Sequence, residues 1–140
     1  MILMPAISIR QPWAWAILNA GKDVENRSWP TRHRGPILIH AGRWFRLDEV
    51  RKEFALFMAR REQFGTPESD AKIFMEMRVK TGGIVGMATI VDCVRGHASP
   101  WAMPGQWHWV LADTRPLEFW PCKGRLGIFK VEYPHSMSEE

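Results

Sequence analysis

SIRQPWAWAILNAGKDVENRSWPTRHRGPILIH, residues 8–40, is the stretch that decides the fold. A strand over residues 6–10 leads into it and ends just before Pro12, whose missing N–H costs nothing at the first position of a helix. Apolar side chains then recur every three or four positions over residues 13–20, and Gly21 suits the end of a helix. The stretch therefore begins as a strand that is followed at once by a short helix.

The remainder of the chain is predicted to be mostly β. Residues 23–27 alternate, with Glu25 and Arg27 on one face, and residues 36–40 form an apolar, β-branched strand. We expect a fold of class α+β, mainly β, with about six strands closed or nearly closed into a small barrel that removes exposed edges. The other strands are predicted over residues 83–94, 107–113, 117–119 and 126–133, and two structural helices over residues 47–64 and 69–78.

Length and composition are those of one globular domain. The 140 residues predict a single domain over residues 1–134 and a disordered tail over residues 135–140. No apolar run reaches the ~18–20 residues of a membrane helix, and the N-terminus lacks signal-peptide features, so we expect a cytoplasmic protein with no membrane partner. Cys93 and Cys122 have no CxxC spacing, so we expect two small buried side chains, no metal site and no cofactor.

Positive charge and tryptophan are both distributed unusually. Residues 1–46 carry seven basic and two acidic side chains, whereas the whole chain has a formal charge of +4. Such a local excess attracts phosphates, although an ordinary solvated face has the same composition. The chain also holds eight tryptophans, more than a domain of this size is expected to bury. One or two of them are therefore candidates for stacking on a planar ligand such as a base.

Lys22, Glu25 and Arg27 form the most informative polar cluster. Glu25 and Arg27 are two positions apart in a predicted strand and share a face, and Lys22 lies in the preceding turn, from which it can fold back over that face. Two cations and a carboxylate can hold a phosphate and hydrogen-bond the edge of a base. The alternative is a surface ion pair, worth about 0–1 kcal/mol.

These three residues match the ASCH family signature, written G-x-K-x-x-E-x-R. The signature's glycine falls at Ala20, and Gly21 follows it, which predicts a slightly different turn before the lysine. The resemblance extends over about residues 6–133 and is to the bacterial and phage branch of the family. It is carried by SIRQPWA, RSWPTRHRGPILIHA, GGIVGMATIVDCV, WVLAD and GRLGIF, in that order along the chain.

The resemblance implies a PUA-like β-barrel with a cleft beside the first helix, lined by the signature residues. It also implies binding of RNA or action on modified nucleosides. Some ASCH-like proteins resemble amidohydrolases of acylated cytidine that use a lysine and a threonine nucleophile. Glu25 stands where that threonine would be, so this chain lacks the nucleophile. Ser28 is the nearest hydroxyl in the sequence, and in a regular strand it faces away from Glu25.

Five further side chains are candidates for the cleft. Arg10 and Gln11 flank the turn after the first strand and are suited to phosphate contacts, and Trp13 either paves the cleft floor or packs under the helix. His40 ends a strand, where it either moves protons or is a hydrogen-bonded structural residue. Trp101 lies in a loop rich in proline, glycine and alanine, which is either a mobile lid that carries a stacking residue or an ordinary covered loop.

Three functions remain open from the sequence. The first is a binding domain for RNA or a modified nucleotide, in which Lys22 and Arg27 contact phosphate or base and Glu25 reads a donor edge. The second is a hydrolase of modified nucleosides or single-stranded RNA, amidohydrolase-like or ribonuclease-like, with Lys22 and Glu25 as its catalytic residues. The third is a protein-interaction accessory domain that presents the helix predicted at residues 47–64. The ligand, the oligomeric state and any protein partner are not determined by the sequence.

Overall fold

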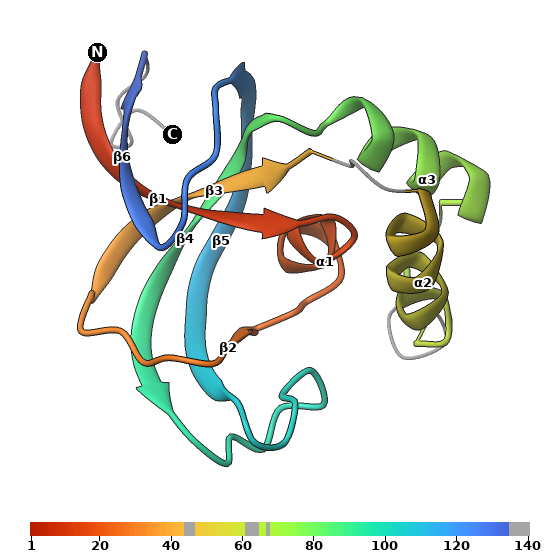
Figure 1. Cartoon of the computed structure of the whole chain (residues 1–140), viewed down its shortest axis with the longest axis horizontal. Helices are drawn as coiled ribbons and strands as arrows, with labels where there is room; N and C mark the ends of the chain where they lie inside the picture. Colours follow the sequence, from red (N-terminus) through yellow and green to blue (C-terminus); the bar gives the residue numbers. More distant parts are fainter. Residues whose placement is uncertain (44–46, 61–64, 67, 135–140) are drawn as a thin grey trace.

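The computed structural model describes residues 1–43, 47–60, 65, 66 and 68–134. Within these ranges the fold is α+β and mainly β, as predicted, and the expected tail at residues 135–140 lies outside the described residues. Figure 1 shows a strongly bent sheet with two helices, α2 and α3, beside one end and α1 close to the sheet. The elements are β1 (Ile2–Arg10), α1 (Trp13–Asn19), β2 (Val24–Arg27), β3 (Gly35–Gly42), α2 (Leu47–Met58), α3 (Asp70–Val79), β4 (Gly83–Val94), β5 (Trp107–Pro121) and β6 (Ile128–Tyr133).

The six strands form one mixed sheet in the order β2-β5-β4-β3-β1-β6. β1 and β3 are parallel, with Ser8 opposite His40 and Arg10 opposite Gly42, and the other neighbours are antiparallel. Because parallel strands end at the same edge of a sheet, the last residues of β1 and β3 lie together. This edge is where the polar side chains of the two strands meet.

The sheet is not closed into a barrel, so the closed form of the prediction is wrong, because the two outer strands of this sheet, β2 and β6, do not pair with each other. β2 has four residues and pairs with β5 over Arg27–Trp107 to Val24–Val110 only. A side chain connects β2 to β1, because the Arg27 Nη2 donates to the Ser8 carbonyl over 2.8 Å.

β5 is one continuous strand, whereas the sequence predicted separate strands over residues 107–113 and 117–119. The two halves are joined through irregular pairing with β4, where the register shifts at three places. Asp113, between the halves, has a positive φ of 51°, and Pro116 stands opposite Gly86. Bulged pairing accommodates a proline in a strand, and it bends the sheet.

Helix α1 packs so closely on the sheet that a side chain at Gly86 of β4 is excluded. A Cβ there would lie 2.5 Å from the Leu18 side chain of α1 and 2.7 Å from the Arg115 carbonyl. Helix α1 starts where the Gln11 side chain accepts a hydrogen bond from the Trp15 N–H over 2.8 Å. It ends at Asn19, one residue before the predicted end, and Gly21 follows with a φ of 72° that suits glycine. The main core on this face joins residues of β1, α1, β3, β4 and β5.

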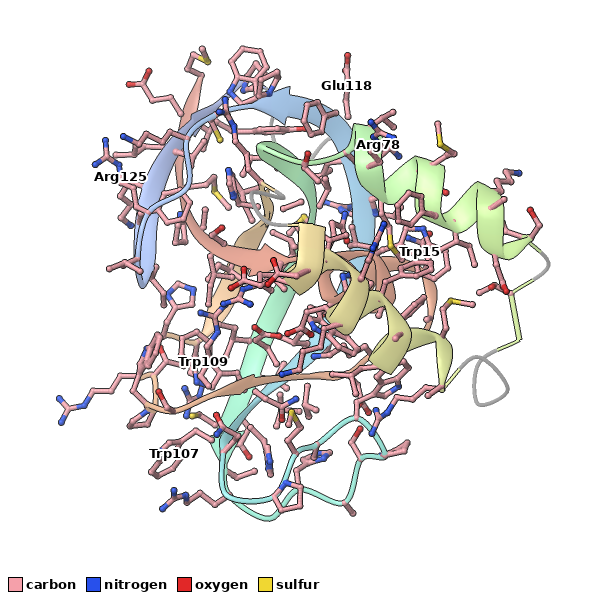
Figure 2. All side chains as sticks on the ribbon, turned by 45° about the vertical axis from the view of Figure 1, so that its right-hand side comes forward. Trp15, Arg78, Trp107, Trp109, Glu118 and Arg125 are labelled. Carbon is pink, nitrogen blue, oxygen red and sulfur yellow. The ribbon has the colours of Figure 1, made fainter. Side chains whose placement is uncertain are left out.

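Helices α2 and α3 cover the other side of α1. Phe57 of α2 is fully buried and meets the Trp15 ring edge-on at 5.7 Å between centroids, and Figure 2 shows Trp15 on the side of α2 and α3. The helix predicted over residues 47–64 ends at Met58, and residues 61–64 lie outside the described residues. In the described part of the chain, no helix has the length and hydropathy needed to cross a membrane.

Candidate functional site

A cleft of the described molecule opens between β2 and the segment that leads into β6, where the sheet does not close. Its volume is about 1250 Å³, above the roughly 300–1000 Å³ of sites for drug-sized ligands. The ends of β1 and β3, the start of α2 and residues 122–127, which we call the basic loop, complete its walls. The cleft therefore has room for more than one nucleotide-sized group.

A chain of three charged side chains supports one wall of the cleft. Lys22 Nζ lies 3.2 Å from Glu25 Oε1, and Arg27 Nε donates to Glu25 Oε2 over 3.0 Å. The strand alternation predicted that Glu25 and Arg27 share a face, and they do. The Glu25 carboxylate is therefore held between two cations. Because Glu25 is buried, these are buried ion pairs and not the surface ion pair that the sequence left open as an alternative.

Lys22 lies beneath the cleft and does not line it. It is 4% exposed, and its ammonium group donates to the Val24 carbonyl as well as to Glu25. Burial lowers the pKa of Lys22 below its usual 10.5, against the attraction of Glu25, which raises it. The geometry therefore gives no support to the predicted contact between Lys22 and a ligand phosphate, because Glu25 lines the cleft and Lys22 does not.

Arg27 is the link between the buried cluster and the cleft surface. Besides Glu25 and Ser8, its guanidinium lies 5.7 Å from the ring centroid of Trp29 and 5.9 Å from that of Trp109. Trp109 is buried in the core, whereas Trp29 is 44% exposed and lines the cleft. An arginine held at one aromatic ring by cation–π attraction leaves the rest of that ring available to a ligand.

Trp29 was not among the residues selected from the sequence. It follows β2, in the sequence RSWP, and the proline after it is the local signal that the strand stops there. A tryptophan at the end of an edge strand has solvent on one side. A tryptophan directly before a proline, at the end of a short strand, was the signal in the sequence that could have identified Trp29.

The three predicted residues at the turn after β1 have different roles. Arg10 is exposed and pairs with Glu53 of α2 at 3.8 Å, and Trp13 donates to the same carboxylate from Nε1 over 2.9 Å. Both line the cleft, and Trp13 also packs edge-on against Phe57. Gln11 is buried, with its oxygen capping α1 and its nitrogen donating to the Lys80 carbonyl over 3.2 Å. Gln11 also lines the cleft, and its predicted contact with phosphate stays a prediction.

His40 of β3 lies at the bottom of the cleft, with both ring nitrogens engaged. Nε2 lies 2.8 Å from the Cys122 carbonyl and Nδ1 lies 3.0 Å from the Ser8 hydroxyl. A carbonyl oxygen only accepts, so Nε2 carries the proton and Nδ1 accepts from Ser8. Burial lowers the pKa of His40 below its usual 6.5, against the hydrogen bond to Cys122. The ring is therefore neutral at physiological pH.

Mild acid is expected to destabilise the protein through His40. As the pH falls below 6.5, His40 binds a proton in the unfolded chain but stays neutral in the folded protein, because burial lowers its folded pKa. The free energy of unfolding therefore decreases as the pH falls from 6.5 towards that lowered pKa. The measurement is the free energy of unfolding in urea from about pH 7.5 to 5, for the wild type and His40→Gln. The wild type should lose more stability than the variant over this range. Parallel curves would show that His40 does not titrate differently in the two states.

The basic loop supplies cations that the sequence reasoning did not select. Lys123 and Arg125 are exposed and line the cleft, and Leu126 between Arg125 and Gly127 is 97% exposed. Figure 2 shows Arg125 at the β6 side of the molecule. The signal for this loop is its composition, because CKGRLG alternates small and basic residues between two strands.

Trp101 is 6% exposed and packs in the cluster of Trp15 and Phe57, outside the cleft. It is a covered residue, so the geometry gives no support to its predicted role in stacking. Cys93 and Cys122 are half-buried rather than buried. Among the described residues, no group of three histidine, cysteine or acidic side chains is arranged to hold a metal ion.

Comparison with known proteins agrees with the resemblance seen in the sequence. The family model of the ASCH domain matches residues 7–121, which is most of the chain and runs from the second half of β1 to the end of β5. A search of the curated proteins found no match.

Proposed function

Since this chain belongs to the ASCH domain family of the PUA-like superfamily, we propose that its cleft binds single-stranded RNA or a nucleotide derived from it. The observation that carries the proposal is the pairing of an exposed tryptophan with a cationic wall in one open cleft. Trp29 supplies a ring face, and the basic loop supplies positive charge in the same cleft. Sites for single strands combine these two elements, because every base has a π-face and every linkage has a phosphate.

The charges of the cleft support an anionic ligand. Its walls carry three carboxylates, and two of them are matched within the protein, Glu25 by Lys22 and Arg27 and Glu53 by Arg10. Five cationic side chains line the same cleft. Three of them, Arg43, Lys123 and Arg125, are paired with no carboxylate among the described residues. The surplus is positive and lies where solvent reaches it. A phosphate is the ligand that such a surplus attracts most strongly.

The signature cluster positions the site in this proposal rather than contacting phosphate. Each carboxylate oxygen of Glu25 accepts from one cation, Lys22 or Arg27. The bond to Arg27 holds that guanidinium beside Trp29. The hydrolase alternative that used Lys22 and Glu25 loses its support for the same reason. The accessory-domain alternative loses support because the apolar side of α2, including Phe57, is used in docking against α1.

Removing the loop cations is expected to weaken binding and its salt dependence together. Each phosphate contact with a single strand contributes a slope of about −0.7 in log K against log[salt]. Lys123→Ala/Arg125→Ala should therefore lower the magnitude of the slope by about 1.4, if each residue contacts one phosphate. The measurement is a tryptophan-fluorescence titration with a short single-stranded RNA at several salt concentrations.

The matched control is Lys72→Ala/Arg78→Ala, which removes the same charge from α3. Figure 2 shows Arg78 on α3, on the opposite side of the view from Arg125. The control should keep the wild-type slope. An equal loss of slope in both variants would show a response to net charge alone, and no change in either would exclude the basic loop as a phosphate site.

A further inference from the structure

The segment between β2 and β3 carries positive charge that lies outside the cleft. Ser28 and Trp29 line the cleft, whereas residues 31–34, which we call the basic turn, do not. We propose that the basic turn is a second phosphate site, reached by a single strand that leaves the cleft past Trp29. This inference rests on the proposed function and deepens it, because it makes the ligand a strand of several nucleotides and not a mononucleotide.

The path of the segment out of the cleft is fixed by contacts with the sheet. The Trp109 Nε1 donates to the Trp29 carbonyl over 3.1 Å, and the Thr31 N–H donates to the Cys93 Sγ over 3.5 Å. Trp109 belongs to β5 and Cys93 to β4, so the chain passes these two strands before it reaches β3, as Figure 1 shows. The basic turn therefore lies beyond Trp29 along a defined route.

Hydrogen bonds within the basic turn give it a defined shape. The Thr31 Oγ1 accepts from the His33 N–H over 3.0 Å, and the Arg34 Nη1 donates to the carbonyls of Thr31 and His33, each over 3.0 Å. The Arg34 Nη2 also lies 3.9 Å from the Asp92 carboxylate of β4. Arg34 therefore holds the turn together, and its charge is matched by Asp92.

Arg32 is the cation that the basic turn presents to a ligand. Its side chain is exposed, and within the described part of the chain it has no hydrogen bond, ion pair or cation–π contact. The sequence of residues 28–34, SWPTRHR, also contains no carboxylate that would repel a phosphate. A cation without a counter-charge on an already ordered turn is suited to bind phosphate, because little backbone freedom is lost on binding.

Trp29 and Arg32 are close enough to contact neighbouring parts of one strand. Three residues of chain separate them, so their Cα atoms are at most about 11 Å apart. The long side chain of arginine extends this reach. A phosphate next to a base stacked on Trp29 can therefore be contacted by Arg32 without any movement of the sheet.

Two groups of cations near one stacking ring favour a strand over a mononucleotide. The basic loop shares the cleft with Trp29, and the basic turn lies outside it. A mononucleotide stacked on Trp29 carries phosphate at one end and can use one of these groups. A nucleotide inside a strand has backbone on both sides, so its neighbours can use both.

The test compares a dinucleotide, whose single phosphate the basic loop can bind, with an RNA of about ten nucleotides, within the roughly 4–16 that single-strand sites cover. Tryptophan fluorescence gives the affinity of each at several salt concentrations. Arg32→Ala should lower the magnitude of the slope of log K against log[salt] by about 0.7 for the longer RNA, the contribution of one phosphate contact. The slope for the dinucleotide should not change.

Two further variants separate the contact from general effects of charge. Arg32→Lys keeps the charge and should keep the wild-type slope for the longer RNA. Arg78→Ala removes an exposed charge from α3 and should also keep it. An equal decrease in Arg78→Ala and Arg32→Ala would show a response to net charge and would overturn the inference.

The remaining outcomes distinguish the basic turn from the cleft. A decrease for the longer RNA alone supports the basic turn as a phosphate site. An unchanged slope in Arg32→Ala, while Lys123→Ala/Arg125→Ala lowers it, would overturn the inference and leave the proposed function in place. An equal decrease for both RNAs would overturn it as well, because Arg32 would then act on the cleft itself. If neither RNA binds the wild type, the proposed function fails and this inference fails with it.

Discussion

Replacing Glu25 with glutamine is expected to lower the free energy of unfolding by about 3–5 kcal/mol, the usual cost of removing one partner of a buried ion pair. The substitution keeps the shape of the side chain and removes the charge between Lys22 and Arg27. Lys22 then has no counter-charge in a place that is 4% exposed. The measurement is urea unfolding at neutral pH, followed by tryptophan fluorescence.

The pH dependence identifies Lys22 as the source of the loss. The folded pKa of Lys22 is lowered by burial, and removing Glu25 removes an attraction that raises it. Between that folded pKa and the usual 10.5 the unfolded chain binds more protons than the folded one, so stability rises with pH. The deficit of Glu25→Gln should therefore shrink as the pH approaches 10.5. A deficit independent of pH would assign the loss to Arg27 or to packing.

A surface pair gives the control for the same chemical change. Glu76 pairs with Lys80 at 3.6 Å on α3, and both side chains are partly exposed. Glu76→Gln should cost no more than about 0.5 kcal/mol, because exposed pairs along a helix contribute little. If Glu25→Gln costs as little as Glu76→Gln, the signature cluster does not hold the cleft wall in place.

Trp29→Ala is expected to weaken binding of a short single-stranded RNA about five- to 150-fold. This corresponds to the roughly 1–3 kcal/mol that stacking on an aromatic ring contributes per base. The exposed ring, with the Arg27 guanidinium 5.7 Å from its centroid, is the surface on which the base would stack. Fluorescence anisotropy of a labelled RNA measures the effect without depending on protein tryptophan.

Trp107→Ala is the matched control. Trp107 is a half-buried tryptophan at the start of β5 that packs under Arg95 and does not line the cleft. It should bind RNA as the wild type does, and Trp29→Phe should recover part of the lost affinity because phenylalanine keeps a smaller ring. Unchanged affinity in Trp29→Ala would rule out the stacking role.

The sequence predicted the elements whose signals are local. Residues 83–94 are found as a strand with the predicted bounds, and α1 starts at Trp13 after Pro12 and stops before Gly21. Helix periodicity, proline and glycine act over a few residues, so a single chain contains that information. Two predicted strands merged into β5 because pairing with β4, a long-range property, carries the strand through Pro116.

The depth of side chains could not be predicted in the same way. The spacing of Lys22, Glu25 and Arg27 placed them in one cluster, but whether Lys22 faces solvent depends on how distant parts of the chain pack over it. Trp101 is buried because a loop far along the chain covers α1 and α2. The basic loop and Trp29 lie in one cleft because the sheet stays open between β2 and β6, whereas the sequence had predicted closure.

The most direct test of the account is an NMR titration of the ¹⁵N-labelled protein with a short single-stranded RNA, in which the indole N–H signals of the eight tryptophans are followed together with the backbone. The account predicts that the Trp29 indole and the backbone of the basic loop shift together and saturate at one ligand concentration, while the indoles of Trp15 and Trp101 stay in place. Shifts confined to α2 and α3, or none at saturating RNA, would contradict it and show that this cleft is not the nucleic-acid site.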